Sequence, residues 1–169
     1  MAVVNTKATA ITNADATTQT LNKMTLSGGR VKSAAGTVEA VSGDSIGSTY
    51  RLARVPSNAR VREVVLQCDA ITTCAADFGL YDTLANGAAV VDADFFASAQ
   101  SLAAALTGTN ILREAGAAGG DVANVEKQIW EILGLTADPK KYYDIAATLT
   151  AAAGSAGTVS LDVGYVDGN

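Results

Sequence analysis

The sequence predicts a mainly antiparallel β protein, and three neighbouring runs of residues carry the prediction. Residues 50–55 alternate apolar and polar side chains, as a strand with one buried face does. Residues 60–69 resume the alternation after a Pro56-Ser57-Asn58 turn, and residues 76–80 form a third alternating run. Strands that follow each other at such short intervals favour antiparallel pairing.

The second run contains an irregularity. Val64, Leu66 and Cys68 share one parity, whereas Val61 has the opposite parity. A bulge beside residues 62–63, or a strand that is buried on both faces there, accounts for this change.

The composition indicates one domain and argues against nucleic-acid binding. The chain has 169 residues, 49% of them hydrophobic, but 33 are alanines and only 5% of the chain is aromatic. The net charge is −5, and the basic residues gather only at four arginines. Nucleic-acid binders usually carry a broad basic surface, so the class does not fit. Few charges and many small residues are typical of a packing unit in an assembly.

We expect synthesis in a cytoplasm, because the chain has no apolar run that could span a bilayer and no signal-peptide pattern at residues 1–20. Cys68 and Cys74 would then be reduced. Cys68 has the apolar parity of its strand, which favours a buried free thiol over a disulfide. With no histidine in the chain, a thiolate or imidazole zinc site is excluded, and no cofactor is expected.

Residues 1–47 are rich in small polar side chains and carry few apolar anchors. They are either a disordered tail or an extended arm that pairs with a sheet edge, its own or a neighbour's. Residues 21–26 and 36–41 are the expected short strands. We therefore divide the chain into an N-terminal arm, 1–47, and a β domain, 48–169.

The middle of the chain predicts loops and short helices. Asn86-Gly87 marks a turn. Phe95, Ala99 and Leu102 share a helical face, which favours a short helix over 92–106, with a strand at 95–101 as the alternative. Residues 107–124 resemble a loop around a short strand at 111–113.

The clearest helix prediction is residues 125–133, with Asn124 as its cap and Gly134 at its end. Such a short helix is expected to lie across a sheet edge or a barrel mouth. Residues 142–150 and 158–166 are predicted strands around a loop of small residues, and the second alternates cleanly.

Two patterns that suggest chemistry have simpler explanations. Residues 43–47 match G-x-S-x-G, but a nucleophile elbow needs a helix after the serine and a base, and a strand is predicted instead. A glycine-serine turn is preferred. Asp92 and Asp94, with Asp82, could contact calcium, although calcium needs six or more oxygens and helix-start acids are commoner. We expect no catalytic or metal residues.

The candidate interface residues are Arg51, Arg54, Arg60, Arg62 and Trp130. The four arginines flank one turn and are expected to project together. They form either a solvated face paired with Glu63 and Asp69 or a docking surface for an acidic partner subunit.

Several segments carry a family resemblance: STYRLARVPSNARV, ADFGLYDT, DADFFASAQSL, IWEILGL with the following DP, YYDIAATLT and the closing GYVD. They are similar to a family of small tailed-phage virion proteins, the head decoration or cement proteins. The resemblance implies an antiparallel β-sandwich of jelly-roll type, to which the residue patterns described above add one or two short helices and an extended N-terminal arm. It also implies a homotrimer that binds the major capsid protein on the outer surface of the expanded head.

Other functions stay open at this point. One is a tail, neck or fibre-attachment part of the virion. Another is a carbohydrate-binding adhesin, for which Trp130, Tyr142 and Tyr143 are the candidate stacking platform. A small hydrolase is the last alternative. No nucleic-acid or membrane partner is expected.

Overall fold

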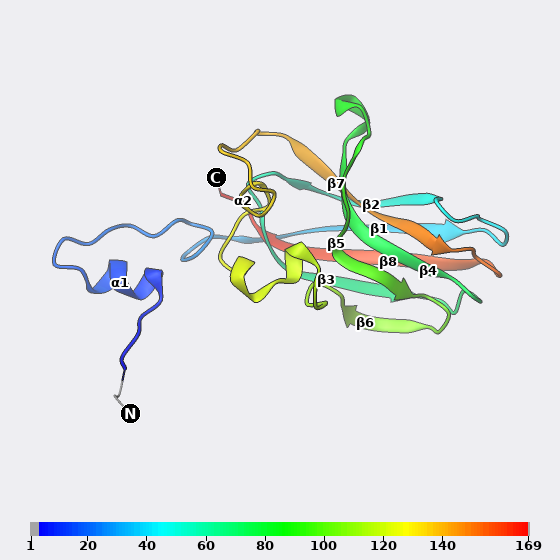
Figure 1. Cartoon of the computed structure of the whole chain (residues 1–169), viewed down its shortest axis with the longest axis horizontal. Coiled ribbons are helices and arrows are strands. Elements are labelled where there is room, and N and C mark those ends of the chain that lie inside the picture. The colour runs from blue at the N-terminus through cyan, green and yellow to red at the C-terminus, as the bar shows by residue number, and fades with distance from the viewer. Residues whose placement is uncertain (1–3, 169) are drawn as a thin grey trace.

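The structure is a computed structural model that describes residues 4–168, and it confirms a mainly β chain with two antiparallel sheets (Figure 1). The strands are β1 (Val31–Ala40), β2 (Thr49–Pro56), β3 (Arg60–Cys68), β4 (Ala75–Asp82), β5 (Val90–Ser101), β6 (Leu106–Asn110), β7 (Tyr142–Ala151) and β8 (Gly157–Val166). The helical segments are α1 (Thr9–Asp15), η1 (Leu84–Asn86), η2 (Ala118–Gly120), η3 (Val122–Asn124) and α2 (Ile129–Ile132).

The two sheets have the strand orders β1-β8-β3-β6 and β2-β7-β4-β5. Every connection between successive strands crosses from one sheet to the other, except the β4–β5 hairpin. Eight strands in two sheets of this order form a β-sandwich of jelly-roll type, as expected. No helix within residues 4–168 is long and apolar enough to cross a membrane.

The core lies between the sheets and is formed by alternate residues of the strands. Val64 and Leu66 of β3 are fully buried in one sheet, and Phe78 of β4 and Ile145 of β7 are fully buried in the other. Burial of such side chains is the main favourable contribution to folding. In these strands, the apolar residues of the alternating sequence pattern therefore face the core, and the polar residues face outward.

Five predicted strands are confirmed: those at 50–55, 60–69, 76–80, 142–150 and 158–166 correspond to β2, β3, β4, β7 and β8. The Pro56 turn is present, with the Ala59 amide donating to the Pro56 carbonyl at 3.0 Å. The bulge is also confirmed, because the register of β3 against β8 shifts between Val61 and Glu63.

The helix predicted over 92–106 is wrong, and the alternative strand is correct. Residues 90–101 form β5, whose register against β4 shifts at several points. Each shift breaks the two-residue alternation, so that Phe95, Phe96 and Ala97 are buried in succession. The strand predicted at 111–113 is also displaced, because β6 ends at Asn110.

The helix predicted over 125–133 is reduced to the single turn of α2. Gln128 has an extended backbone, with ψ 160°, and caps the turn in place of Asn124. The Glu131 carboxylate accepts from the Gln128 amide at 2.9 Å, which completes a capping box. Gly134 follows with a φ of +70° and ends the turn as predicted.

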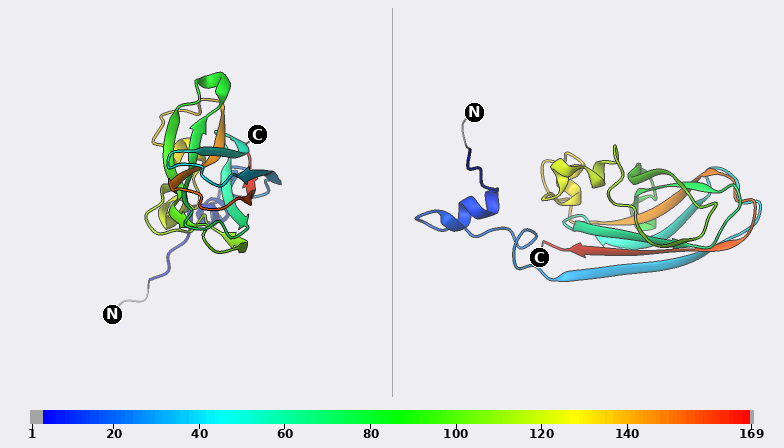
Figure 2. Two further views of the ribbon diagram at one scale, coloured as in Figure 1. Left: turned by 90° about the vertical axis from the view of Figure 1, so that its right-hand side faces the viewer. Right: turned by 90° about the horizontal axis from the view of Figure 1, so that it is seen from below.

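The sandwich begins at residue 31, earlier than the predicted boundary after residue 47. β1 pairs with β8 along all ten of its residues, so this part of the expected arm pairs with a sheet edge of its own chain. Residues 4–30 extend past the end of the sandwich near which the C-terminus lies, and they include α1 (Figures 1 and 2). Residues 24–28 form a turn in place of the short strand predicted at 21–26.

Candidate interaction sites

Arg51 and Arg54 of β2 bind one carboxylate, that of Asp144 on the neighbouring strand β7. Arg51 Nη1 lies 2.9 Å from Asp144 Oδ2, and Arg54 Nε lies 2.6 Å from Oδ1. The Asp144 side chain is only 7% exposed. Burial alone would raise the pKa of this carboxyl, but the hydrogen bonds from Arg54 and Arg51 outweigh burial and lower the pKa.

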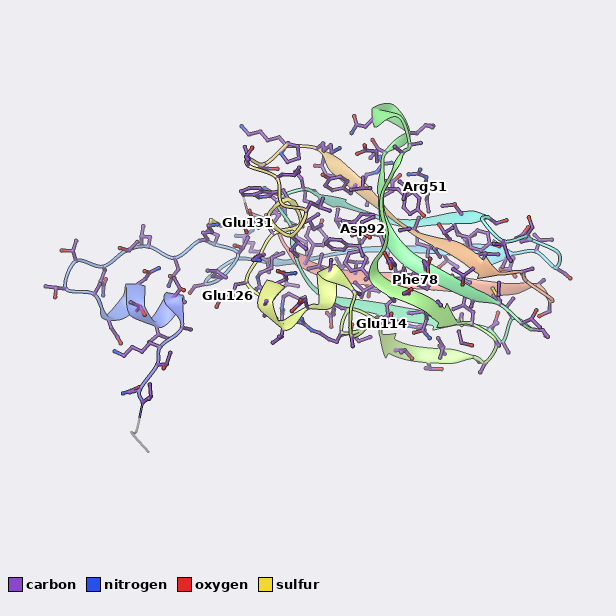
Figure 3. All side chains as sticks on the ribbon, in the orientation of Figure 1. Arg51, Phe78, Asp92, Glu114, Glu126 and Glu131 are labelled. Atoms are coloured by element: carbon purple, nitrogen blue, oxygen red, sulfur yellow. The ribbon has the colours of Figure 1, made fainter. Side chains whose placement is uncertain are left out.

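Arg51 also holds the β4–β5 hairpin, which projects from the sandwich (Figure 3). Its guanidinium donates to the carbonyls of Asp82 and Ala88 at 2.8 and 3.1 Å. It lies 5.5 Å from the centroid of the Tyr81 ring. Arg51 therefore has a structural role, because its donors are used within the chain.

Arg60 and Arg62 belong to β3, in the opposite sheet from Arg51 and Arg54. Arg60 Nε donates to the Thr25 carbonyl at 2.6 Å, and Nη1 donates to the Val125 carbonyl at 3.5 Å. Burial, followed by the nearby charge of Arg62, lowers the pKa of Arg60. Within residues 4–168 neither arginine forms an ion pair, and Arg62 is exposed.

The four arginines are thus split between two sheets. The carboxylate that pairs with two of them is Asp144, and the expected partners Glu63 and Asp69 pair with none of them in the described residues. Asp69 instead accepts from the Thr158 amide at 3.0 Å. Asp144 lies 90 residues or more along the chain from both arginines, so only the sheet topology brings it near.

Trp130 lies in α2 and is half-buried, with its indole Nε1 donating to Gln128 Oε1 at 2.6 Å. Tyr142 is 56% exposed, whereas Tyr143 is buried in the core. The three aromatic residues proposed as a stacking platform therefore do not form one exposed surface.

The remaining candidate sites have structural partners. Asp44 of the G-x-S-x-G segment accepts from the Val41 amide at 2.9 Å and from the Tyr50 hydroxyl at 2.5 Å, and turns lie at residues 42–43 and 46–47. Burial, and then the adjacent Asp94, raises the pKa of Asp92. Among residues 4–168 no three acidic, cysteine or histidine side chains gather as a metal site. Cys68 and Cys74 are buried free thiols.

The structure has two exposed features, of which the sequence predicted the first, as one of two alternatives, and missed the second. The first is the arm, in which α1 has no buried residue. The second is the hairpin tip, where Leu84 is 82% exposed. An open groove of about 470 Å³ lies between this hairpin and β1, lined in part by Ala35, Ala53 and Leu84. The Asn86-Gly87 pair predicted the turn, but no sequence pattern predicted that the β4–β5 hairpin projects from the sandwich.

No family model matches the sequence, and no curated protein is similar to it. Two solved structures are similar. One is a chain of the capsid of Ralstonia phage GP4, with a TM-score of 0.58 and 19% identity over 83% of this chain and 86% of that chain. The other belongs to the capsid asymmetric unit of cyanophage Pam1, with a TM-score of 0.49 and 18% identity over 82% of this chain and 85% of that one. The protein therefore shares its fold with a chain of the GP4 capsid.

Proposed function

We propose that the protein is a bacteriophage capsid decoration, or cement, protein. It binds the outer surface of the expanded head and stabilises contacts between subunits of the major capsid protein. The observation that carries the proposal is the likeness of its sandwich to a chain of the GP4 capsid, which extends over most of both chains. The phage-like segments of the sequence support the same role.

A cement protein acts by mass action. Copies that bind the assembled shell and not the separated subunits shift the equilibrium toward the shell. The arm, residues 4–30, supports this role because it extends beyond the sandwich and leaves apolar side chains such as Ile11 and Leu21 exposed. Contacts through both sandwich and arm would bind more strongly than either alone.

The acidic balance of the chain favours the outer surface. A net charge of −5 would be repelled by packaged DNA inside the head. In the proposed role the protein is made in the host cytoplasm, forms a homotrimer and has no catalytic activity. Arg62 and Trp130 are proposed contact residues, because Arg62 is free of intrachain ion pairs among the described residues and Trp130 is partly exposed.

Heating of shells tests this function. Expanded shells of the parent phage are heated with and without saturating protein, and opening is followed by light scattering. The proposal predicts a higher opening temperature that saturates with added protein. An unchanged opening temperature at saturating protein would contradict it. Binding of the protein to purified tails, assayed in parallel, tests the alternative that it is a tail part of the virion.

A further inference from the structure

The edges of the two sheets differ in how they are protected. The edge strands are β1 and β6 in one sheet and β2 and β5 in the other. An unprotected edge is a template for pairing with another strand, and proteins usually interrupt such edges with bulges, prolines, short strands or covering segments.

Three of the edges carry such interruptions. β6 has only five residues and a register shift against β3. β2 has a bulge between Arg51 and Ala53 and ends at Pro56. β5 has several register shifts against β4, and η2 packs beside it, since a Cβ at Gly119 would lie 2.7 Å from the Phe95 ring.

β1 has none of these interruptions. Its ten residues pair with β8 without a register shift. Within residues 4–168, no backbone hydrogen bond joins it to any other segment. Its two charged residues, Lys32 and Glu39, stand near its ends and already bind Asp167 and Thr158 of the same chain. Residues 33–38 are uncharged, and β2 of the same chain approaches this strand at Gly36 without forming a backbone hydrogen bond to it. The outward backbone groups of β1 are therefore left unpaired among the described residues.

The arm supplies a segment suited to this edge. Residues 16–22 are not helical, contain three threonines with high strand propensity, and include Leu21, which is 95% exposed. An added strand would lie beside the groove that borders β1. The groove is lined by Ala35, Leu52, Ala53 and Leu84 together with the ion-paired Arg51, Arg54 and Asp144. Its apolar residues, including the exposed Leu84, offer contacts to alternate side chains such as Leu21.

The arm is held away from the β1 edge of its own chain. Arg60 binds the Thr25 carbonyl at 2.6 Å, and Lys23 forms an ion pair with Glu131 of α2 at 2.6 Å. These contacts fix the base of the arm, and the residues before it run past the end of the sandwich (Figure 2). Addition of a strand to β1 from within the same chain would have to break these contacts, whereas a strand from another molecule would not.

We propose that residues 16–22 of one copy add as a strand to the open edge of β1 in a second copy. Main-chain hydrogen bonds supply the affinity of such strand addition, and the groove selects the side chains. This strand addition joins copies of the chain in the absence of any shell. Its test is therefore independent of the proposed function.

Hydrogen exchange of the full chain tests the proposal. Three proteins are compared at high concentration: the full chain, a variant with Thr18→Pro and Thr20→Pro, and a matched variant with Thr18→Ala and Thr20→Ala. Proline removes the amide donors that strand pairing needs, whereas alanine retains them. We expect β1 amides to exchange about tenfold faster in the proline variant than in the other two, with β6 unchanged. Equal β1 exchange in all three proteins would overturn the proposal.

A peptide identifies the partner segment. The chain lacking residues 4–22 retains every strand, and α1 contributes no buried residue, so the sandwich is expected to fold. Addition of a peptide of residues 13–24 should restore the protection of β1 in this shortened chain. A peptide with prolines at positions 18 and 20 is the control. Protection of another edge, or equal effects of both peptides, would overturn the assignment.

Discussion

The Arg51 guanidinium of β2 donates a 2.9 Å hydrogen bond to the Asp144 carboxylate of β7, and it also binds the carbonyls of Asp82 and Ala88. One side chain thus joins two adjacent strands to the projecting hairpin. Arg54 binds the same carboxylate, so a single acidic side chain balances two cations.

Replacement of this carboxylate should destabilise the fold. Asp144→Asn leaves two guanidiniums without their negative partner, and we expect a loss of about 2 kcal/mol in the free energy of unfolding. Urea denaturation measures the loss. Asp162→Asn is the matched control, because Asp162 is exposed on β8 and its replacement should change stability by less than about 0.5 kcal/mol. Equal effects of the two variants would contradict the structural role of Asp144.

The contribution of Asp144 should depend on pH. Its pKa is lowered in the folded chain from the ordinary value of 3.8, so its charge stabilises the fold above that value. This stabilisation is lost as the pH falls through the lowered pKa. The stability difference between wild type and Asp144→Asn is therefore expected to be constant near neutral pH and to shrink below pH 3.8. A stability difference between the two proteins that grows on acidification would contradict a lowered pKa of Asp144.

Gly36 of β1 is predicted to tolerate no side chain. A Cβ at this position would lie 1.8 Å from the Leu52 carbonyl oxygen of β2, where the edges of the two sheets meet. Gly36→Ala must displace one strand, and we expect a destabilisation of about 1–3 kcal/mol in thermal or urea unfolding. Ser33→Ala, at an exposed site on the same strand, is the control and should have little effect.

Both cysteines should resist modification in the folded protein. Burial raises the pKa of the Cys68 and Cys74 thiols, which disfavours the reactive thiolate. Titration with a disulfide reagent at pH 8 should detect both thiols quickly in denaturant and neither quickly without it. Rapid reaction of either thiol in the native chain would place it at the surface.

The sequence predicted the strands in which apolar and polar residues alternate without interruption. β8 alternates between buried and more exposed residues along most of its length, and β2 does so on either side of its bulge, so their pattern follows from one buried face. β4 and β7 were found from partial alternation, because residues 78–81 and 143–147 are buried in succession. The Pro56 turn and the bulge beside Glu63 were predictable from local residue preferences. Such features depend on few residues that are close in sequence.

Other features depend on contacts that the sequence does not reveal. β1 is an edge strand of mostly exposed small residues with little apolar periodicity, so only its second half was predicted, as the short strand at 36–41. β5 mimics a helix because its bulges shift the alternation. Asp144 is the partner of Arg51 and Arg54 only because β7 lies beside β2, which is a property of the strand order.

The most direct test of the proposed function is co-sedimentation of the purified protein with empty shells of the parent phage. Expanded and unexpanded shells are compared over a range of protein concentrations. The cement role predicts saturable pelleting with expanded shells alone. Absence of pelleting with either kind of shell, or equal pelleting with both, would contradict it.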